Sequence, residues 1–579
     1  MGGLDWTMIG LYFLGLVAIV WWAARNQRSS TDYFLAGRNV GWFVIGASLF
    51  ASNIGSEHLV GLAGSGASDG MAMAHYELHA WCLLVLGWVF VPFYSRSAVF
   101  TMPEFLERRY NAASRWMLSV VSLVAYVFTK VSVSLYAAGV VFRVLLPKEM
   151  FGGYDPFWVG ALSVVVLTGI YTMLGGLKAV VYTDTMQAIV LIVGSVFVSI
   201  YGLNELGGWT KLRELCTSVP VVQNVATQPA EDPAGAAPAA TAAIGQPVKT
   251  KNYFNMWRPW DDPDFPWLGI LLGAPIVGLW FWCTDQYIVQ RTLAAKNMKN
   301  ARRGTIWGAY LKLSPVFLFI VPGMIAFALA KSGRHLDMPN SDHAYPALVK
   351  ALLPPGLKGL VVGALLAALM SSLSSVFNSC STLFTVDIYQ KIRRKASERE
   401  LVRIGRIATA VVVLLGIAWI PFMRYVSKGL YQYLQSVQAY LGPPITAVFF
   451  LGVFSKRING RGALAGLIAG FVLGMAKLAA QTVAGIETVA AGMPGWVLAF
   501  GRFNFLYFCL VLFAVSVLVV VIVSLLTRPP APEKLDGLTY ATTAAAGREE
   551  TRQSWNKWDV IHTVIILGII LTVYVYFTG

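Results

Sequence analysis

Besides Lys130 and Lys477, three ionisable side chains interrupt the long apolar runs of this sequence. Glu77 and Asp184 open such runs, and Lys312 lies roughly 10 Å inside another, at 1.5 Å of helix rise per residue. Ionisable groups at these places are costly and usually functional. Two plainer explanations stay open, because an acid is favourable at a solvated helix N-terminus and a lysine can reach the membrane surface. If neither explanation applies, Glu77, Asp184 and Lys312 are candidate binding residues.

A serine run indicates a cation site. Ser371, Ser372, Ser374 and Ser375 lie close together in another apolar run. Hard cations such as sodium want oxygen ligands, and hydroxyls with freed backbone carbonyls supply them without a full negative charge. Positions i, i+3 and i+4 share one helix face, so Ser371, Ser374 and Ser375 can point at one place. The alternative is that these hydroxyls bond back to their own helix.

Two apolar spans have the composition of broken helices. One runs from Gly46 to Leu59 and is crowded with small and polar residues, and the other runs from Leu272 to Trp282 around Pro275. They are the second and seventh spans, and an offset of five gives opposite orientations, as inverted five-helix repeats require. Transporter sites form at such breaks near the bilayer midplane. Close helix packing is the alternative reading of the small residues.

The elements that would position these residues are transmembrane helices. Of the 579 residues, 56% are hydrophobic and only 13% are charged, whereas an ordinary soluble protein carries about 25% charged residues. The apolar runs reach the roughly 20 residues that cross a bilayer. The sequence therefore predicts an all-α integral membrane protein with about fourteen transmembrane helices.

The net charge of +16 reflects membrane topology rather than a nucleic-acid partner. Seven short segments between apolar runs hold 28 of the 45 Lys and Arg residues, and such residues mark the cytoplasmic side. With these segments on the cytoplasmic side, we predict a multi-pass protein of the cell (inner or plasma) membrane with both termini outside the cytoplasm.

We expect three segments between or after the apolar runs to differ in how they fold. An Ala/Pro/Thr-rich stretch at 225–248, in the long outer loop, is too polar to order itself. The aromatic and acidic segment 257–267 is expected to cover the outer mouth. The inner segment 528–556 is expected to be mobile.

Several short motifs also recur together in one known family. They are Phe34–Arg38, Ala51–Ser56, Tyr182–Gln187, Trp282–Gln286, Ile288–Arg291, Phe384–Ile388, Tyr440–Pro444 and Gly452–Arg457, the last followed by Gly462, Ala463 and Gly466. With these motifs the chain resembles the solute:sodium symporter family, and within it the sodium/glucose cotransporter branch, over about residues 30–527.

The resemblance implies a LeuT-type fold of two inverted five-helix repeats, with one extra helix before them and three after. The expected parts are an N-terminal helix in 1–30, a first repeat in 31–205, an outer loop in 206–265, a second repeat in 266–458, and three C-terminal helices in 459–579 with a cytoplasmic loop at about 528–556.

The resemblance also implies the binding residues. Positions that line the sugar site of sugar-transporting members correspond here to Asn53, His58, Glu77, Phe281, Trp282, Lys312 and Gln435. The principal sodium site, here site one, corresponds to the carbonyls of Ala51, Ile54 and Ala368 and the hydroxyls of Ser371 and Ser372. A second sodium site of some members, here site two, corresponds to Asp184, Ser374 and Ser375. Na⁺ is then the co-transported ion, with two ions expected per sugar.

Two residues depart from the family pattern. Phe281 stands where sugar-transporting members usually carry a tyrosine that helps to close the inner gate, so a hydrogen bond to Asn53 is lost. Gly278 replaces a polar residue near the sugar. The flat aromatic face is kept, but selectivity and gate tightness are put in question.

The function that the resemblance implies is sodium-coupled symport of a sugar, a hexose such as glucose or galactose, by alternating access. The alternatives are symport of inositol or another small solute, and a non-accumulating sugar sensor or sodium leak. No nucleophile–base spacing or His/Cys metal cluster indicates an enzyme. The expected partners are the sugar, sodium and the lipid bilayer, with no nucleic acid and no obligate protein partner.

Overall fold

The computed structural model describes residues 2–25, 30–55, 57–220, 250–334, 336, 338–423 and 429–578. Ser56 and the Ala/Pro/Thr-rich stretch at 225–248 lie outside these residues, so the expected disorder of that stretch stays a prediction.

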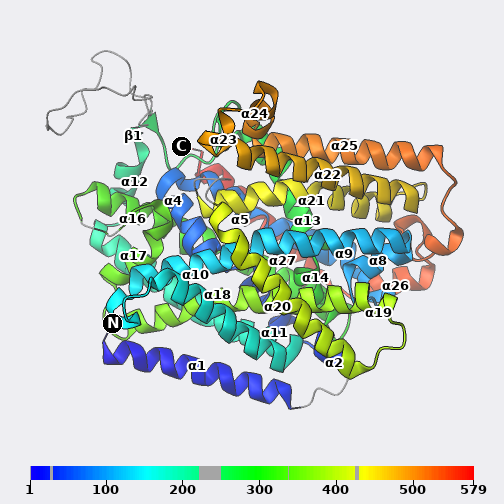
Figure 1. The fold of residues 1–579 in the computed structure, drawn as a ribbon, viewed down its shortest axis with the longest axis horizontal. Coiled ribbons are helices and arrows are strands. Elements are labelled where there is room, and N and C mark those ends of the chain that lie inside the picture. The colour runs from blue at the N-terminus through cyan, green and yellow to red at the C-terminus, as the bar shows by residue number, and fades with distance from the viewer. Residues whose placement is uncertain are drawn as a thin grey trace.

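Long helices run side by side through the molecule and form its body (Figure 1). The first spans are α1 (Gly3–Ala24); a broken span of α3 (Trp42–Asn53), the π-helical η2 (Glu57–Leu62) and α4 (Ala63–Asp69); and α5 (Ala74–Leu78), α6 (Ala80–Val85), η4 (Leu86–Phe90) and α7 (Val91–Ser97) in one line. Next come α9 (Ala112–Tyr126), η5 (Val127–Val131) and α10 (Ser132–Leu145) as one span, and α11 (Pro156–Leu206) as two.

The second set begins with α13 (Trp267–Thr284) and α14 (Gln286–Leu293), then α15 (Met298–Lys312), η7 (Val316–Ile320) and α16 (Val321–Lys331). It continues with α18 (Leu357–Thr382), η9 (Leu383–Tyr389) and α19 (Gln390–Ile392), then α20 (Glu398–Met423) and α21 (Leu430–Phe454). The last three spans are α22 (Gly460–Ala484), α25 (Phe505–Leu526) and α27 (Lys557–Tyr576).

Short elements connect the spans. They are α2 (Ser30–Leu35), η1 (Ala36–Arg38), η3 (Gly70–Met73), α8 (Met102–Arg109), η6 (Lys148–Phe151), α12 (Trp209–Thr217), η8 (Ser341–His343), α17 (Ala344–Leu352), α23 (Glu487–Ala490), α24 (Gly495–Arg502), η10 (Pro532–Lys534), η11 (Tyr540–Thr542) and α26 (Ala545–Gln553). The strands β1 (Val219–Pro220) and β2 (Thr250–Lys251) pair antiparallel, with Val219 opposite Lys251.

The number of membrane crossings agrees with the sequence. The described residues contain 12 helices long and apolar enough to cross a membrane, and two shorter apolar helices, Trp42–Asn53 and Pro156–Ile170. The first of these is half of the broken second span, and the second is the start of α11. Gly176 divides α11 with φ 54° and ψ −162°, a conformation that favours glycine. The chain is therefore a multi-pass membrane protein, and within the described residues these helices agree with the roughly fourteen crossings predicted.

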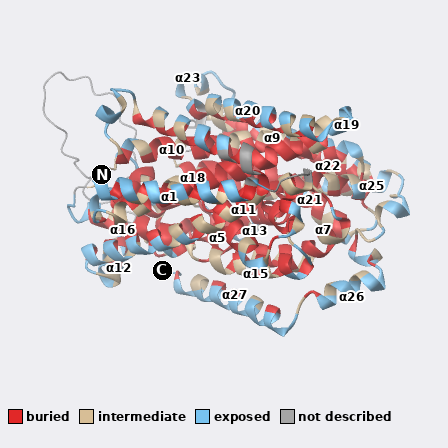
Figure 2. Ribbon diagram, turned by 90° about the horizontal axis from the view of Figure 1, so that it is seen from below, coloured by how far each residue is buried: buried red, intermediate tan, exposed pale blue. Residues whose placement is uncertain are grey.

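Burial separates an inner bundle from lipid-facing helices (Figure 2). In the span Leu357–Ile392, 89% of the most apolar window is buried, against 28% in Phe505–Leu526 and 22% in Lys557–Tyr576. α18 therefore lies at the centre, and α25 and α27 present apolar side chains outward as lipid-facing helices do.

The first helix break is confirmed and the second lies elsewhere. α3 ends at Asn53, and Ile54 leaves helical geometry with ψ 88°. α13, by contrast, continues through Pro275 and breaks only at Asp285, where ψ is 130°. A Cβ at Gly273 would lie 2.5 Å from the carbonyl oxygen of Leu506. The small residues around Pro275 therefore serve close packing against α25, and the prediction of a break between Leu272 and Trp282 was wrong.

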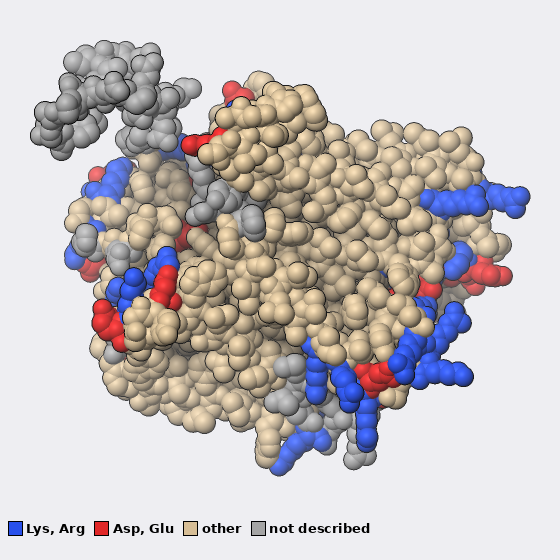
Figure 3. Space-filling view, viewed as in Figure 1, with Lys and Arg blue, Asp and Glu red and all other residues tan. Residues whose placement is uncertain are grey.

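The two ends of the bundle differ in charge. Both chain ends lie at the same end of the molecule (Figure 1). Lys and Arg gather at the opposite end, around α19 (Figure 3). The orientation relative to the membrane, with the termini outside, stays a prediction.

The inner segment 528–556 is folded rather than mobile. Arg96 donates to the carbonyl of Gly547 at 3.1 Å, and Lys534 donates to the carbonyl of Glu107 at 2.9 Å. Arg302 donates to Oγ of Ser554 at 2.5 Å. The expectation of mobility was wrong because hydrogen bonds in both directions, from core arginines to this segment and from Lys534 to the core, hold the segment in place.

Candidate functional site

A closed central cavity lies where the two broken spans meet α15 and α21. It is lined by Asn53, Glu57, His58, Tyr76, His79, Lys130, Val277, Gly278, Phe281, Trp282, Lys312, Tyr431, Leu434, Gln435 and Gln438. Its volume is about 30 Å³, room for about two water molecules. The walls must therefore move apart before a larger molecule enters.

Glu77 is the hub of the polar wall. Its carboxylate accepts from Nζ of Lys312 at 2.6 Å and from the hydroxyl of Tyr431 at 2.8 Å, and lies 3.2 Å from Nε2 of His58. Glu77 is fully buried and Lys312 is 3% exposed. Lys312 thus does not reach the membrane surface. The structure brings all seven predicted sugar-site residues together, six in the lining and Glu77 directly behind it.

Aromatic rings form the facing wall. Phe281 and Trp282 meet edge to face at 5.0 Å, and the Lys312 ammonium lies 5.5 Å from the Trp282 ring centre. Near them, a Cβ at Gly278 would lie 2.8 Å from Nδ1 of His79. His79 therefore takes the space that a side chain at position 278 would fill. This contact could not be predicted from the sequence, because residues 79 and 278 are far apart in the chain.

Two polar atoms of the lining have no hydrogen-bond partner in the part of the chain that the structure describes. Nδ1 of His58 and the hydroxyl of Tyr76 are buried without a hydrogen-bond partner among the described residues. Such atoms are rare in folded proteins and call for an explanation. A ligand with several hydroxyl groups would satisfy both, and Asn53, whose Nδ2 lies 3.4 Å from Nε2 of His58, adds a further donor and acceptor.

Site one lies directly behind the first helix break. Ser371 donates towards the carbonyl of Ala51 at 3.4 Å, and Oγ of Ser372 is buried without a partner in the described part of the chain. Ala368 lies one turn earlier on α18 and is buried. The helix break leaves backbone carbonyls such as that of Ile54 outside the helical hydrogen-bond ladder. These oxygens fit a monovalent cation.

Site two already contains a cation of the protein itself. Asp184 is fully buried and accepts from Ser371 at 2.5 Å, Ser48 at 2.6 Å and Ser52 at 3.0 Å. Asp184 is therefore not a solvated helix N-terminus.

The cation is the guanidinium of Arg291. Its Nη2 donates to Ser375 at 2.5 Å and lies 3.5 Å from Asp184. Ser374 donates to the carbonyl of Ser371 at 2.9 Å, so its hydroxyl bonds back to its own helix. The structure buries Arg291 fully, although a basic residue at the end of a short helix would ordinarily mark the cytoplasmic side.

A second, larger cavity opens above the central one, on the side of the 250–266 loop. We call it the vestibule; it has a volume of about 510 Å³ and is lined in part by Asp69, Asp264, Asp342 and Gln432. Gln432 donates to Asp264 at 2.9 Å, so this loop lines the mouth as predicted. Burial raises the pKa of Asp264, and it raises the pKa of Asp342 to about 7.

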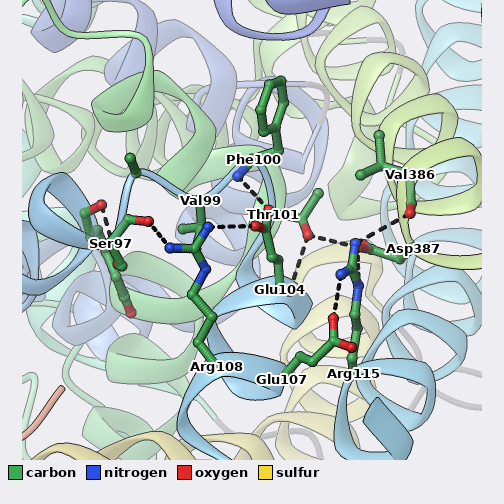
Figure 4. Close-up of polar contacts among 12 residues, drawn as sticks. Ser97, Val99, Phe100, Thr101, Glu104, Glu107, Arg108, Arg115, Val386 and Asp387 are labelled. Carbon is green, nitrogen blue, oxygen red and sulfur yellow. Dashed lines mark hydrogen bonds and ion pairs between the residues drawn. The ribbon is translucent and has the colours of Figure 1, made fainter. Parts of the chain in front are cut away.

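A polar network closes the opposite end of the bundle (Figure 4). Asp387, at the end of η9, accepts from Thr101 at 2.8 Å and from Nε of Arg115 at 2.7 Å. Arg115 also pairs with Glu107 at 2.5 Å. The network ties α8 and α9 to the end of the α18 span.

Comparisons with known proteins agree with this geometry. Residues 33–470 match the sodium:solute symporter family. The chain is 39% identical to sodium/glucose cotransporter 1 of Ovis aries over 93% of its own length and 81% of that protein. It is 40% identical to the sodium/myo-inositol cotransporter of Canis lupus familiaris over 93% and 75% of the two chains.

Among solved structures, a Na⁺-coupled sialic acid symporter in a substrate-bound outward-open state superposes with a TM-score of 0.68. The match covers 91% of this chain and 99% of that one at 20% identity, so it bears on the fold alone. It confirms the predicted LeuT-type architecture.

Proposed function

The chain belongs to the sodium:solute symporter family, and we propose that it uses the sodium gradient to import a sugar, in the first instance a hexose such as glucose or galactose. The observation that carries the proposal is the central cavity, where a carboxylate, an ammonium, amides and an imidazole face two flat aromatic rings. Aromatic faces suit the C–H surface of a sugar ring, and the polar groups suit its hydroxyls.

Sodium is the proposed driving ion and is a substrate rather than a resident cofactor. Site one supports this, because the Ser372 hydroxyl, which has no hydrogen-bond partner among the described residues, lies against Gly55 at the helix break. A cation at site one would hold the break in the shape that presents Asn53 and His58 to the cavity. Sodium and sugar then favour one conformation, which is a reciprocal coupling free energy.

Transport requires the two ends of the bundle to open in turn. The vestibule gives access from one side, and the Thr101–Arg115–Asp387 network closes the other. We propose that the central cavity widens towards the vestibule to admit sodium and sugar, closes, and then opens at the inner end. The predicted division at residues 205 and 266 into two repeats defines the parts that move against each other.

Inositol is the second candidate substrate. The sodium/myo-inositol relative is as similar to this chain as the glucose relatives, and His79 occupies the space beside Gly278. A symporter needs no catalytic group, so we propose no enzyme activity. We place the protein in the cell membrane with both termini outside and with no obligate protein partner.

Uptake into proteoliposomes tests the proposal. Purified protein should accumulate a labelled hexose only when an inward sodium gradient is imposed, and unlabelled sugars and inositol should compete in the order of their affinities. Sodium-dependent current without accumulation would instead identify a sensor or leak.

Two substitutions test the site within the same assay. Lys312→Ala and Gln435→Ala remove polar groups of the lining, which should weaken apparent sugar affinity about five- to a hundredfold. Unchanged affinity in either variant would remove that residue from the site.

A further inference from the structure

A buried ion pair lies between the central cavity and site one. Glu57 begins η2, directly after the helix break, and is fully buried; Lys130 in η5 is 3% exposed and pairs with Oε1 of Glu57. Burying two charges costs about as much as their attraction returns, so such a pair is weak evidence for stability. Ionisable groups inside a membrane protein are more often functional.

The second oxygen of Glu57 lies near the Ser372 hydroxyl of site one. Oε2 of Glu57 lies 2.6 Å, and Oγ of Ser372 1.9 Å, from the point where a Cβ of residue 55 would stand. Only a glycine at position 55 leaves room for both. Ca²⁺, an ion of nearly the same size as Na⁺, takes oxygens at about 2.3–2.6 Å, so two oxygens that share one ion lie up to about 5 Å apart. These two oxygens meet that condition.

The hydroxyl of Ser372 gives an independent sign that a ligand belongs here. It is 1% exposed and has no hydrogen-bond partner within the described residues, although the Glu57 carboxylate faces the same glycine. The Ser372 hydroxyl therefore has lone pairs to offer a cation, and Oε2 of Glu57, which can accept from more than one partner, lies beside the same point.

We propose that Glu57 supplies a carboxylate oxygen to the sodium ion at site one and, through its other oxygen, links that ion to Lys130. Site one is then not a neutral set of hydroxyls and carbonyls, because it includes one anionic ligand. Lys130 balances the charge of Glu57 from behind while Oε2 stays turned to the ion.

The Glu57–Lys130 pair also connects the sodium ion at site one to the sugar-binding cavity through side-chain contacts. Nζ of Lys130 lies 4.9 Å from the ring centre of Phe281 and 5.4 Å from that of Tyr287, within cation–π range. An ion that fixes Glu57 therefore fixes Lys130 and the ring on which the sugar would stack. Glu57 and Lys130 are positioning residues for the coupling, and by reciprocity a bound sugar strengthens sodium binding.

Sodium binding to the purified protein tests this inference without any sugar. Binding of ²²Na⁺ is measured by scintillation proximity for the wild type, Glu57→Gln, Glu57→Asp and Lys130→Gln. Glu57→Gln keeps the shape and loses the charge, so we expect its sodium Kd to rise at least tenfold. In Lys130→Gln the carboxylate remains, so the sodium Kd should stay within threefold while apparent sugar affinity in uptake falls at least tenfold.

The outcomes separate coupling from simple charge balance. If Glu57 only neutralises Lys130, Glu57→Gln leaves the sodium Kd unchanged, and that result overturns the inference. If Glu57→Gln does not fold, Glu57→Asp decides, because the shorter side chain withdraws the oxygen from Ser372; an unchanged Kd again overturns it.

The inference rests on the proposed function only through the sugar arm. A wild type that binds ²²Na⁺ through Glu57 but accumulates no sugar contradicts the proposed function and leaves the sodium ligand standing. If the protein accumulates sugar in a sodium gradient but the sodium Kd does not change in the Glu57 variants, the proposed function stands and the inference about Glu57 is contradicted.

Discussion

The two predicted sodium sites lie on the same helix, α18, and each has a buried carboxylate with a tethered cation beside it. At site one, Lys130 stands behind Glu57 and leaves the second carboxylate oxygen turned to Ser372. At site two, Arg291 stands among the ligands, because it donates to Ser375 and faces Asp184. A sodium ion entering site one meets no side-chain cation among the predicted ligands of the described residues, whereas one entering site two must displace a guanidinium.

The difference shows that a set of ligand residues does not define an available site. The Arg291–Asp184 contact of 3.5 Å is longer than the roughly 2.7–2.9 Å of a charge-assisted hydrogen bond. The guanidinium of Arg291 therefore does not form a short hydrogen bond with the Asp184 carboxylate, and a sodium ion can compete with it for that carboxylate. At site two sodium must replace the Arg291 guanidinium, whereas at site one it binds without replacing a side-chain cation.

The largest test of this difference is the coupling ratio. We expect two sodium ions per sugar, with Arg291 withdrawing from Asp184 during the cycle. A tenfold sodium gradient contributes about 1.4 kcal/mol per ion and a 100 mV potential about 2.3 kcal/mol. One ion would then hold a sugar gradient of a few hundredfold, and two would hold one on the order of 10⁵. Reversal potentials in proteoliposomes at several gradients measure the ratio. A ratio of one would mean that Arg291 never leaves site two.

Asp184→Asn should have the next largest effect, on stability. It leaves Arg291 as an unpaired buried charge, which costs about 3–5 kcal/mol. Thermal unfolding of the purified protein should show a lowered Tm, and the double variant Asp184→Asn with Arg291→Gln should recover much of it. An additive loss in the double variant would show that the two side chains do not depend on each other.

Two serines of one helix provide a matched pair for a third test. Ser372→Ala removes a hydroxyl with no hydrogen-bond partner among the described residues, so we expect apparent sodium affinity to fall about five- to a hundredfold. Ser375→Ala removes a hydroxyl that Arg291 already engages, so its effect on sodium affinity should be several times smaller. Sodium dependence of sugar uptake measures both, and equal effects would erase the proposed difference between the sites.

The smallest expected effect comes from the vestibule, which serves both sites alike. Burial raises the pKa of Asp342 to about 7, so this carboxyl is neutral at pH 6 and ionised at pH 8. The folded protein thus keeps a proton that an unfolded chain releases near pH 4, and stability falls slightly as pH rises from about 4 through 7. The added negative charge should improve apparent sodium affinity by less than about threefold. Asp342→Asn should remove this pH dependence.

The spans and the first break could be predicted because they depend on local patterns. Apolar length fixes a crossing, and small and polar residues before Ile54 weaken the helix where it ends. Pro275 misled because a proline costs a helix one hydrogen bond but does not end it when the surrounding packing is close. The break at Asp285 has no comparable signal.

The contacts within the site were harder to predict because they join distant segments. Lys130 was visible as a charge inside a span, but its pairing with Glu57 depends on how the second and fourth spans pack. Arg291 sits at the end of a short helix, where a basic residue resembles a cytoplasmic anchor. Tyr431 completes the Glu77 hub and carried no signal at all.

Ser371 belongs to both sodium sites, and its hydroxyl has only one hydrogen to donate. Oγ of Ser371 lies 2.5 Å from Asp184 and 3.4 Å from the carbonyl oxygen of Ala51. While the hydrogen points at Asp184, the lone pairs of the same oxygen are turned to the ion at site one, and the carboxylate polarises them. A sodium ion that reaches Asp184 competes with the Ser371 hydroxyl for the carboxylate, and this makes the Ser371 oxygen a weaker ligand for the ion at site one. The two ions are therefore expected to arrive in a fixed order, set by the direction of one O–H bond.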